Sequence, residues 1–209
     1  MTRLYLASTS PARLALLAQI GVEPVVVPSR VDEPAAVERE QARLGREMTT
    51  PEMVALLARA KAEAVADRCA DGIVLGGDSS FLLDGRSLGK PHTAERAAAR
   101  WRENRGATGV LWSGLHLIDT RSPDRPSVTR TDAAEVRFAD DITEEEILDY
   151  VASGEPLEVA GAFTIDGLAA PLIAAVSGAP SAVIGLSLPG LRLALAELGV
   201  GLAELRAGR

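Results

Sequence analysis

The sequence predicts an α/β fold in which helices flank a mixed sheet. Short aliphatic runs followed by polar turns and helical stretches, as in parallel βα units, begin near residues 4 and 73. Two longer runs near residues 110–118 and 128–138 flank the polar connection Ser-Pro-Asp-Arg-Pro, so they are predicted to pair as a hairpin in the outer part of the sheet. Because parallel-type units and hairpins alternate with helices, a mixed sheet is favoured over a purely parallel one.

The chain begins with a strand, a small polar turn and a helix. Leu4–Ala7 is predicted as a short buried strand, and a helix is expected from Pro11 to about residue 20. Ser10 suits the N-cap and Pro11 the first helical position. Gly21 suits the left-handed residue that follows the last turn.

The next segment alternates strands and helices less regularly. A second strand is predicted at Val25–Val27, and the charged stretch 29–49 is expected to be a loop with some helix. A strong helix then runs from Thr50 to about Arg68. The run 73–75 is predicted as a buried strand that ends abruptly at the glycine pair Gly76-Gly77.

The C-terminal half contains clear helix and turn signals. Asp84-Gly85 predicts a tight hairpin turn, and a helix is expected from about residue 93 to 104. A capping box, Thr143 to Glu146, begins another helix that stops near Ser153. Short apolar runs rich in glycine and alanine fill residues 160–188, and the last helix is expected to begin after Pro189.

Length and composition restrict the class of protein. A chain of 209 residues that is 47% hydrophobic can bury a substantial core, and without an interdomain linker it is expected to form one bilobed domain over residues 1–209. The net charge of −7 gives no reason to expect nucleic acid or an anionic membrane as a partner. One cysteine and two histidines cannot form a disulfide or the usual structural zinc sites. With no signal peptide or long apolar run, a cytoplasmic location is expected.

The first strand–turn–helix unit is a candidate anion site. Its free backbone N–H groups and the positive end of the helix dipole point beyond the strand, and Arg13 could add a bidentate phosphate contact. The alternative is that Ser10 caps an ordinary helix and Arg13 is solvated. The residues alone favour that alternative, because capped helices far outnumber anion sites.

Asp78 is the most informative single residue. A carboxylate beyond a buried strand, flanked by glycines and serines, lies where open α/β sheets bind ligands. The alternative is an Asp-Ser turn that satisfies its own backbone. The residues alone weigh the two interpretations equally.

Three further charged positions have both a functional and an ordinary interpretation. Asp32-Glu33 offers the hard oxygen ligands that suit magnesium or manganese, but charged loops are commoner than metal sites. Lys61 interrupts the apolar face of its helix, so it either extends to solvent at the edge of that face or points into an anionic pocket. Lys90 offers the same choice, with an exposed loop lysine as the default.

Taken in order, these residues form a recognisable series. The segments are Leu6–Arg13 (LASTSPAR), Val31-Asp32-Glu33, Ala60-Lys61-Ala62, Gly77-Asp78-Ser79, Leu88-Gly89-Lys90-Pro91, Gly154-Glu155-Pro156 and Ala160-Gly161. In this order the chain resembles the Maf family over nearly its whole length.

The resemblance implies a fold, a reaction and a set of site residues. The fold is the two-lobed α/β fold of inosine triphosphate pyrophosphatases, with a central cleft for the nucleotide. The reaction is hydrolysis of a nucleoside triphosphate between its α and β phosphates, assisted by Mg²⁺ or Mn²⁺. Asp78 is then the proton acceptor, and Glu33 with Asp78 contacts the metal. The residues expected around the triphosphate are Ser8, Ser10, Arg13, Lys61 and Lys90. A homodimer is implied by resemblance only.

Four positions depart from the family pattern. Members selective for thymidine and uridine triphosphates typically carry arginine, threonine and glutamine where this chain has Ala12, Ser79 and Asp166. Asp166 is closer to the glutamate of members that prefer methylated guanosine triphosphate, so the base preference stays open. A lysine common before the Ala-Gly step is Val159 here, which removes one candidate phosphate contact.

Two other functions remain as alternatives at this stage. One is a weakly active nucleotide-binding regulator of septum formation or cell division, to which the family has been linked. The other is nucleotidyl transfer to a sugar or cofactor, for which no acceptor motif is visible. The joint presence of Asp78, Glu33 and both lysines favours the hydrolase.

Overall fold

The computed structural model describes residues 2–206, and it confirms the predicted mixed sheet flanked by helices. Seven strands form one open sheet with the order β2-β1-β3-β5-β6-β7, and β4 pairs with β3 outside this path. β1 pairs in parallel with β2 and β3, and the other pairings are antiparallel. The strands are β1 (Arg3–Leu6), β2 (Val25–Val26), β3 (Gly72–Leu83), β4 (Arg86–Leu88), β5 (Thr108–Asp119), β6 (Ser127–Phe138) and β7 (Ile173–Gly178).

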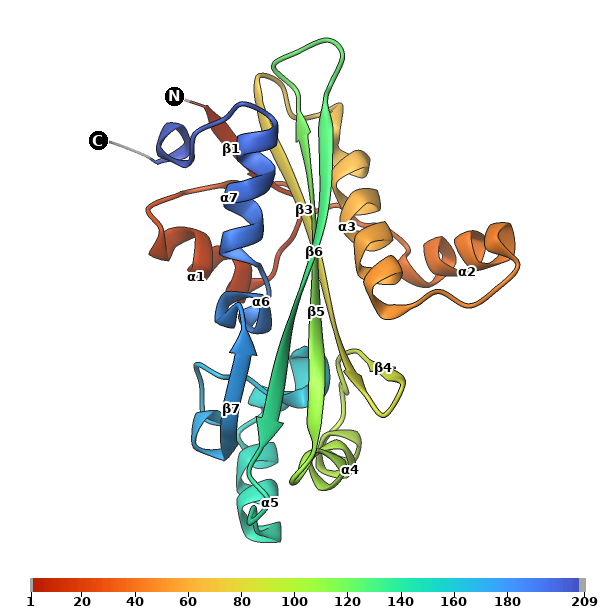
Figure 1. Cartoon of the computed structure of the whole chain (residues 1–209), viewed down its shortest axis with the longest axis vertical. Coiled ribbons are helices and arrows are strands. Elements are labelled where there is room, and N and C mark those ends of the chain that lie inside the picture. Colours follow the sequence, from red (N-terminus) through yellow and green to blue (C-terminus); the bar gives the residue numbers. More distant parts are fainter. Residues whose placement is uncertain (1, 207–209) are drawn as a thin grey trace.

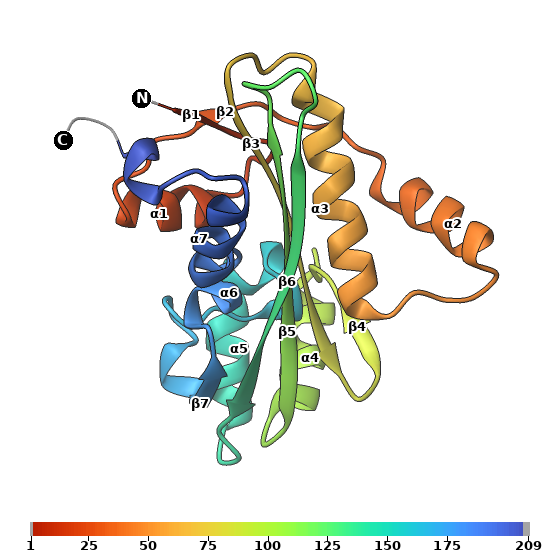
Figure 2. The same cartoon turned by 45° about the horizontal axis from the view of Figure 1, so that its top comes forward.

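Helices lie on both faces of this sheet (Figure 1). They are α1 (Pro11–Gln19), α2 (Glu33–Leu44), α3 (Thr50–Ala66), α4 (Ala94–Asn104), α5 (Glu144–Ala152), α6 (Pro180–Ile184) and α7 (Leu188–Glu197). Short 3-10 turns cover Glu155–Glu158, Ala160–Ala162, Ala170–Leu172 and Leu202–Leu205. Figure 2 shows α3 on one side of the long strands and α1, α6 and α7 on the other. We call the side covered by α3 the first face and the opposite side the second face.

The hydrophobic core is divided along the three twelve-residue strands β3, β5 and β6. At one end, Phe81, Trp101 and Phe138 centre a cluster that includes residues of α4 and α5. At the other end, one cluster packs α1 and α7 against Leu75 and its neighbours, and a smaller one lies under α3. The cores at the two ends are therefore joined by the same continuous strands.

The predicted helix ends are confirmed where the local chemistry is strong. The Ser10 hydroxyl accepts a hydrogen bond from the backbone N–H of Arg13, and Pro11 is the first residue of α1. Gly21 has a positive φ of 76° after that helix. Thr143 and Glu146 form the expected capping box at the start of α5.

The segment 29–49, expected to be a loop with some helix, contains a twelve-residue helix, α2, capped by Asp32 and closed by Gly45 at a φ of 67°. Two other sequence predictions were wrong. β3 does not end at residue 75 but continues to Leu83, because its pairing with β5 overrides the low strand propensity of glycine and aspartate. β5 is an interior strand and not part of the outer sheet, since β6 and β7 lie beyond it.

Two glycines allow α3 to lie very close to the first face. A Cβ at Gly76 would stand 2.0 Å from the carbonyl oxygen of Ala58, and one at Gly114 would stand 2.4 Å from that of Val54. No side chain fits at these distances, so the backbone of α3 rests directly on β3 and β5. This contact fixes the position of every α3 side chain that faces the sheet.

A buried histidine on the first face predicts a pH-dependent stability. His116 is 4% exposed, and one of its ring nitrogens lies 2.7 Å from the Thr129 hydroxyl. Burial, helped by the charge of Arg59, lowers the pKa of His116 from 6.5 to about 4. Between these two values the unfolded chain binds a proton that the native protein does not. The free energy of unfolding is therefore highest above pH 6.5, where His116 is neutral in both states, and it decreases as the pH falls toward 4.

We expect the free energy of unfolding to drop by about 3 kcal/mol from this residue as the pH falls across that window. Urea unfolding of the wild type and of His116→Gln at several pH values measures the effect. The stability of the wild type should fall more steeply than that of the variant. Parallel pH profiles would show that His116 does not contribute.

None of the helices in residues 2–206 is both long enough and apolar enough to cross a membrane.

Candidate active site

The candidate site lies where β3 has no partner on one edge. β1 pairs with β3 as far as Leu75, and β4 begins to pair at Phe81. Within the part of the chain that the structure describes, no strand pairs with this edge at Gly76–Ser80. The predicted carboxyl-terminal opening therefore exists, but it is the end of β1 and not of β3 that creates it.

The same segment separates the two hydrophobic cores. Leu75 belongs to one core and Phe81 to the other, and the five residues between them are Gly-Gly-Asp-Ser-Ser. Because successive residues of a strand point to opposite faces, Asp78 and Ser79 serve different sides of the sheet. The site thus has two halves joined through one strand.

On the first face, three charged side chains converge. The ammonium nitrogen of Lys61, on α3, lies 2.7 Å from Asp78 Oδ1 and 2.8 Å from Glu33 Oε1. Lys61 and Asp78 are 8% and 9% exposed, whereas Glu33, in the first turn of α2, is half-buried. Lys61 therefore does not extend to solvent; it points into an acidic site, as the second sequence interpretation proposed.

Burial dominates the electrostatics of Asp78. It raises the pKa of the Asp78 carboxyl above its ordinary value, and the nearby Glu33 adds to the rise. The charges of Lys61 and Arg13, together with the Lys61 hydrogen bond, act in the opposite direction. Because the effect of burial outweighs that of the two cations, the Asp78 carboxylate is a stronger proton acceptor than a solvated aspartate.

On the second face, Arg13 is buried, and each of its three guanidinium nitrogens donates one hydrogen bond. Its Nε donates to the carbonyl oxygen of Gly185 at 2.9 Å, one terminal nitrogen donates to Ser8 Oγ at 3.0 Å, and the other donates to Ser79 Oγ at 3.3 Å. Burial lowers the pKa of the Arg13 guanidinium, and Asp78 and Glu33 oppose that change. Arg13 is not solvated, so the ordinary interpretation of this residue was wrong.

Ser8 and Ser10 hold the turn between β1 and α1. The backbone N–H of Ser10 donates to Ser8 Oγ at 3.2 Å, and the same hydroxyl accepts from Arg13. Hence the small polar turn, the start of α1 and Arg13 form one unit beside the open edge of β3. Such a unit can bind an anion through backbone N–H groups and a guanidinium.

The structure does not bring every predicted residue to this cluster. Lys90 is exposed and lies 3.4 Å from Glu158 Oε2 in a loop after β4. Asp166 is also exposed, and Ala12 is a half-buried residue of α1. Val159 lies between two 3-10 turns. Of the three positions linked to base selection, only Ser79 contacts the cluster, through Arg13.

Sequence reasoning missed the carbonyl oxygen of Gly185. It accepts hydrogen bonds from Arg13 and from the Ser79 hydroxyl, and it belongs to the residue that follows α6. A backbone acceptor leaves no signal in residue type. The φ of 137° at Gly185 is accessible mainly to glycine, and that glycine was the available clue.

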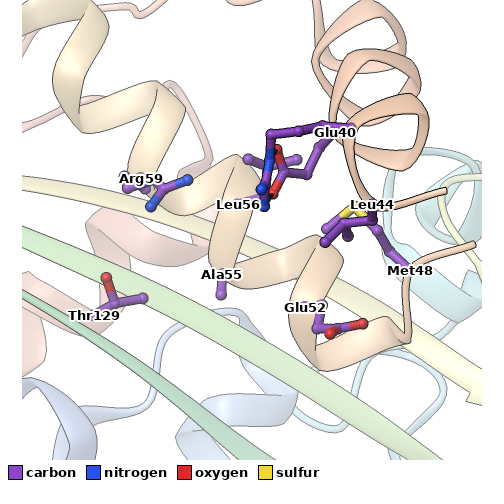
Figure 3. Close-up of a pocket in the computed structure, with 9 residues that line it drawn as sticks. Glu40, Leu44, Met48, Glu52, Ala55, Leu56, Arg59 and Thr129 are labelled. Atoms are coloured by element: carbon purple, nitrogen blue, oxygen red, sulfur yellow. Dashed lines mark hydrogen bonds and ion pairs between the residues drawn. The ribbon is translucent and has the colours of Figure 1, made fainter. Parts of the chain in front are cut away.

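A separate pocket lies between α2 and α3 (Figure 3). Its volume is about 280 Å³, and it is lined by Glu40, Arg43, Leu44, Met48, Glu52, Ala55, Leu56, Arg59 and Thr129. This lining includes none of the predicted site residues. We therefore assign the site to the β3 edge and not to this pocket.

The donor set of the site fits a divalent cation carried by a phosphate ligand. Two carboxylate oxygens, from Asp78 and Glu33, converge on one point, as their shared contact with Lys61 shows. Among residues 2–206 no group of three or more His, Cys, Asp or Glu side chains forms a complete metal site. Magnesium is commonly held by one or two carboxylates together with substrate phosphates and water, so two carboxylates suffice here.

The fold and the site together define an α/β protein in which buried charged side chains gather at the end of a parallel strand. Residues 3–198 match the family described as Maf-like protein, and the chain belongs to that family.

Relatives across nearly the full length carry a common name. A protein named nucleoside triphosphate pyrophosphatase from Leifsonia xyli subsp. xyli is 56% identical, covering 99% of this chain and 98% of its own length. One of the same name from Streptomyces coelicolor is 48% identical, covering 97% and 94%. Another from Thermosynechococcus vestitus is 44% identical, covering 99% and 98%.

Proposed function

We propose that this protein is a nucleoside triphosphate pyrophosphatase, which hydrolyses a nucleoside triphosphate to the monophosphate and pyrophosphate. The observation that carries the proposal is the buried Asp78 carboxylate between two cations, at the only edge of β3 left open within residues 2–206. The names of the relatives support the same reaction. We further propose that residues 1–209 form one bilobed domain, since β3, β5 and β6 contribute to both lobes.

In the proposed mechanism Asp78 accepts a proton from water as that water attacks the α-phosphorus. A new phosphorus–oxygen bond forms, the bond from the α-phosphorus to the bridging oxygen breaks, and its electron pair leaves with pyrophosphate. Arg13 and the backbone of the Ser8–Ser10 turn hold the phosphates on the second face. Lys61 offsets phosphate charge on the first face, and Lys90 reaches the triphosphate from its loop.

Asp78 and Glu33 would hold Mg²⁺ or Mn²⁺, which offsets charge on the phosphates and on the leaving pyrophosphate. Because no covalent nucleophile is needed, the side chains have only to bind, orient and remove one proton. Base selection is proposed to depend on Ala12, Ser79 and Asp166, with Ser79 acting through its hydrogen bond to Arg13.

Pyrophosphate release by the purified protein is the direct test. We expect the protein, with Mg²⁺ or Mn²⁺, to convert a subset of a panel of ordinary and modified nucleoside triphosphates to monophosphate plus pyrophosphate. Identifying both products excludes transfer of the nucleotide to an acceptor, which also yields pyrophosphate. The accepted subset would reveal the base preference.

Nucleotide binding without turnover of any member of the panel would contradict the proposal. That result would favour a regulatory nucleotide-binding protein. Val159→Lys, which restores the lysine that is common in the family, would then be the first variant to assay.

A further inference from the structure

Lys61 occupies the place between the two carboxylates that a divalent ion would need. Its ammonium lies within 2.8 Å of an oxygen of each, whereas Mg²⁺ and Ca²⁺ bind such oxygens at about 2.0–2.6 Å. An ion bound to the same two oxygens would lie within about 4 Å of the ammonium nitrogen, where two positive charges repel each other strongly. Lys61 and a metal ion therefore compete for these carboxylates.

We propose that Lys61 acts as the resident counter-cation of Asp78 and Glu33 in the free protein, so that the metal ion enters together with the nucleotide and not before it. This inference rests on the proposed function, because it assumes that these carboxylates serve a metal during the reaction.

Lys61 cannot leave the two carboxylates through a movement of the α3 backbone. Gly76 and Gly114 place this helix against the sheet without space for a Cβ, so Lys61 can move only through its side-chain torsions. Its side chain is 10% exposed, so the ammonium cannot escape to water without a new partner. Phosphate oxygens of an entering nucleotide supply that partner and allow Lys61 to exchange carboxylate for phosphate.

Glu33 is the most exposed member of the cluster. Its side chain is 46% exposed, against 12% for Asp78, and it lies at the first turn of α2. Glu33 can therefore leave Lys61 and turn toward an incoming metal while Asp78 stays in place. Metal and nucleotide binding become coupled, because each relieves a cost that the other would meet alone.

Binding of Mn²⁺ alone, measured on the full chain without nucleotide, tests the inference. The wild type should bind weakly, and Lys61→Met should bind at least about tenfold more tightly because the competing charge is gone. Lys61→Arg keeps the charge and should stay weak. Arg59→Met is the matched control, since it removes one positive charge from the solvent side of the same helix, where Arg59 pairs with Glu63 at 3.9 Å.

Equal Mn²⁺ affinity of the wild type and Lys61→Met would overturn the inference, provided that circular dichroism shows both to be folded. A second measurement does not depend on the folding of that variant. We expect the wild type to bind Mn²⁺ weakly and Glu33→Gln to bind it equally weakly. If instead the wild type binds Mn²⁺ at micromolar concentration and Glu33→Gln weakens that binding, Lys61 does not hold the site. Because no nucleotide is present, a failure here is distinct from a failure of pyrophosphate release.

Discussion

Asp78→Asn is expected to lower the turnover number for nucleoside triphosphates by about 10²–10⁴-fold, the usual contribution of a general base. Asparagine keeps the size of the side chain and can still accept the Lys61 hydrogen bond, which is 2.7 Å long in the wild type. It cannot accept a proton from water. Nucleotide binding should survive, because Arg13 and the Ser8–Ser10 turn lie on the other face of the sheet.

Steady-state pyrophosphate release gives the turnover number, and titration calorimetry with a nucleotide gives the affinity. Asp84→Asn is the matched control, because Asp84 is an exposed residue of the hairpin turn at the end of the same strand and asparagine tolerates its φ of 48°. Turnover at the wild-type rate in Asp78→Asn would remove this residue from the role of base.

Gly76→Ala is expected to destabilise the protein strongly, although it adds only one methyl group. The new Cβ would lie 2.0 Å from the Ala58 carbonyl oxygen and 2.8 Å from the Ala62 nitrogen, and both are backbone atoms that no rotamer change can move. Helix α3 has to shift away from the sheet. We expect a loss of about 3 kcal/mol in the free energy of unfolding, or roughly 6–12 °C in Tm for a chain of this size.

Thermal unfolding measures this effect, with Gly89→Ala as the control because no atom lies within 4 Å of a Cβ built there. The same shift would move Lys61 away from Asp78, so catalysis should fall even at temperatures where the variant is folded. A Tm equal to that of the wild type would mean that α3 does not need the close contact.

The sequence predicted the features that depend on neighbouring residues, such as the ends of helices. Ser10, Pro11 and the Thr143–Glu146 box act within one helical turn, and the structure confirms each of them. The length of β3 depends on ten pairings with β5, whose paired residues lie 28 to 46 positions away in the sequence. Glycine and aspartate gave no reason to expect these pairings. Tertiary context also decided between the two interpretations of Lys61 and of Arg13, because only the fold reveals what lies opposite a side chain.

The sequence could not predict how far Lys90 lies from the other site residues. The family motif places Lys90 with the triphosphate, but the structure pairs this lysine with Glu158, which the sequence gave no reason to single out. Lys90 has to leave Glu158 to reach a nucleotide bound at β3. The position of Glu33 beside Lys61, in contrast, follows once α2 is recognised as a helix that begins at Glu33.

Because side chains alternate along β3, the neighbouring residues Asp78 and Ser79 lie on opposite faces of the sheet. Asp78 lies on the side of Lys61 and Ser79 on the side of Arg13, so a point substitution can modify one side while the other remains intact. Insertion or deletion of a single residue between them, in contrast, affects both faces. It would reverse the facing of every later residue of β3 relative to β5, exchanging core and site positions together. Substitutions can therefore change one face of the strand at a time, but the spacing of this strand is fixed.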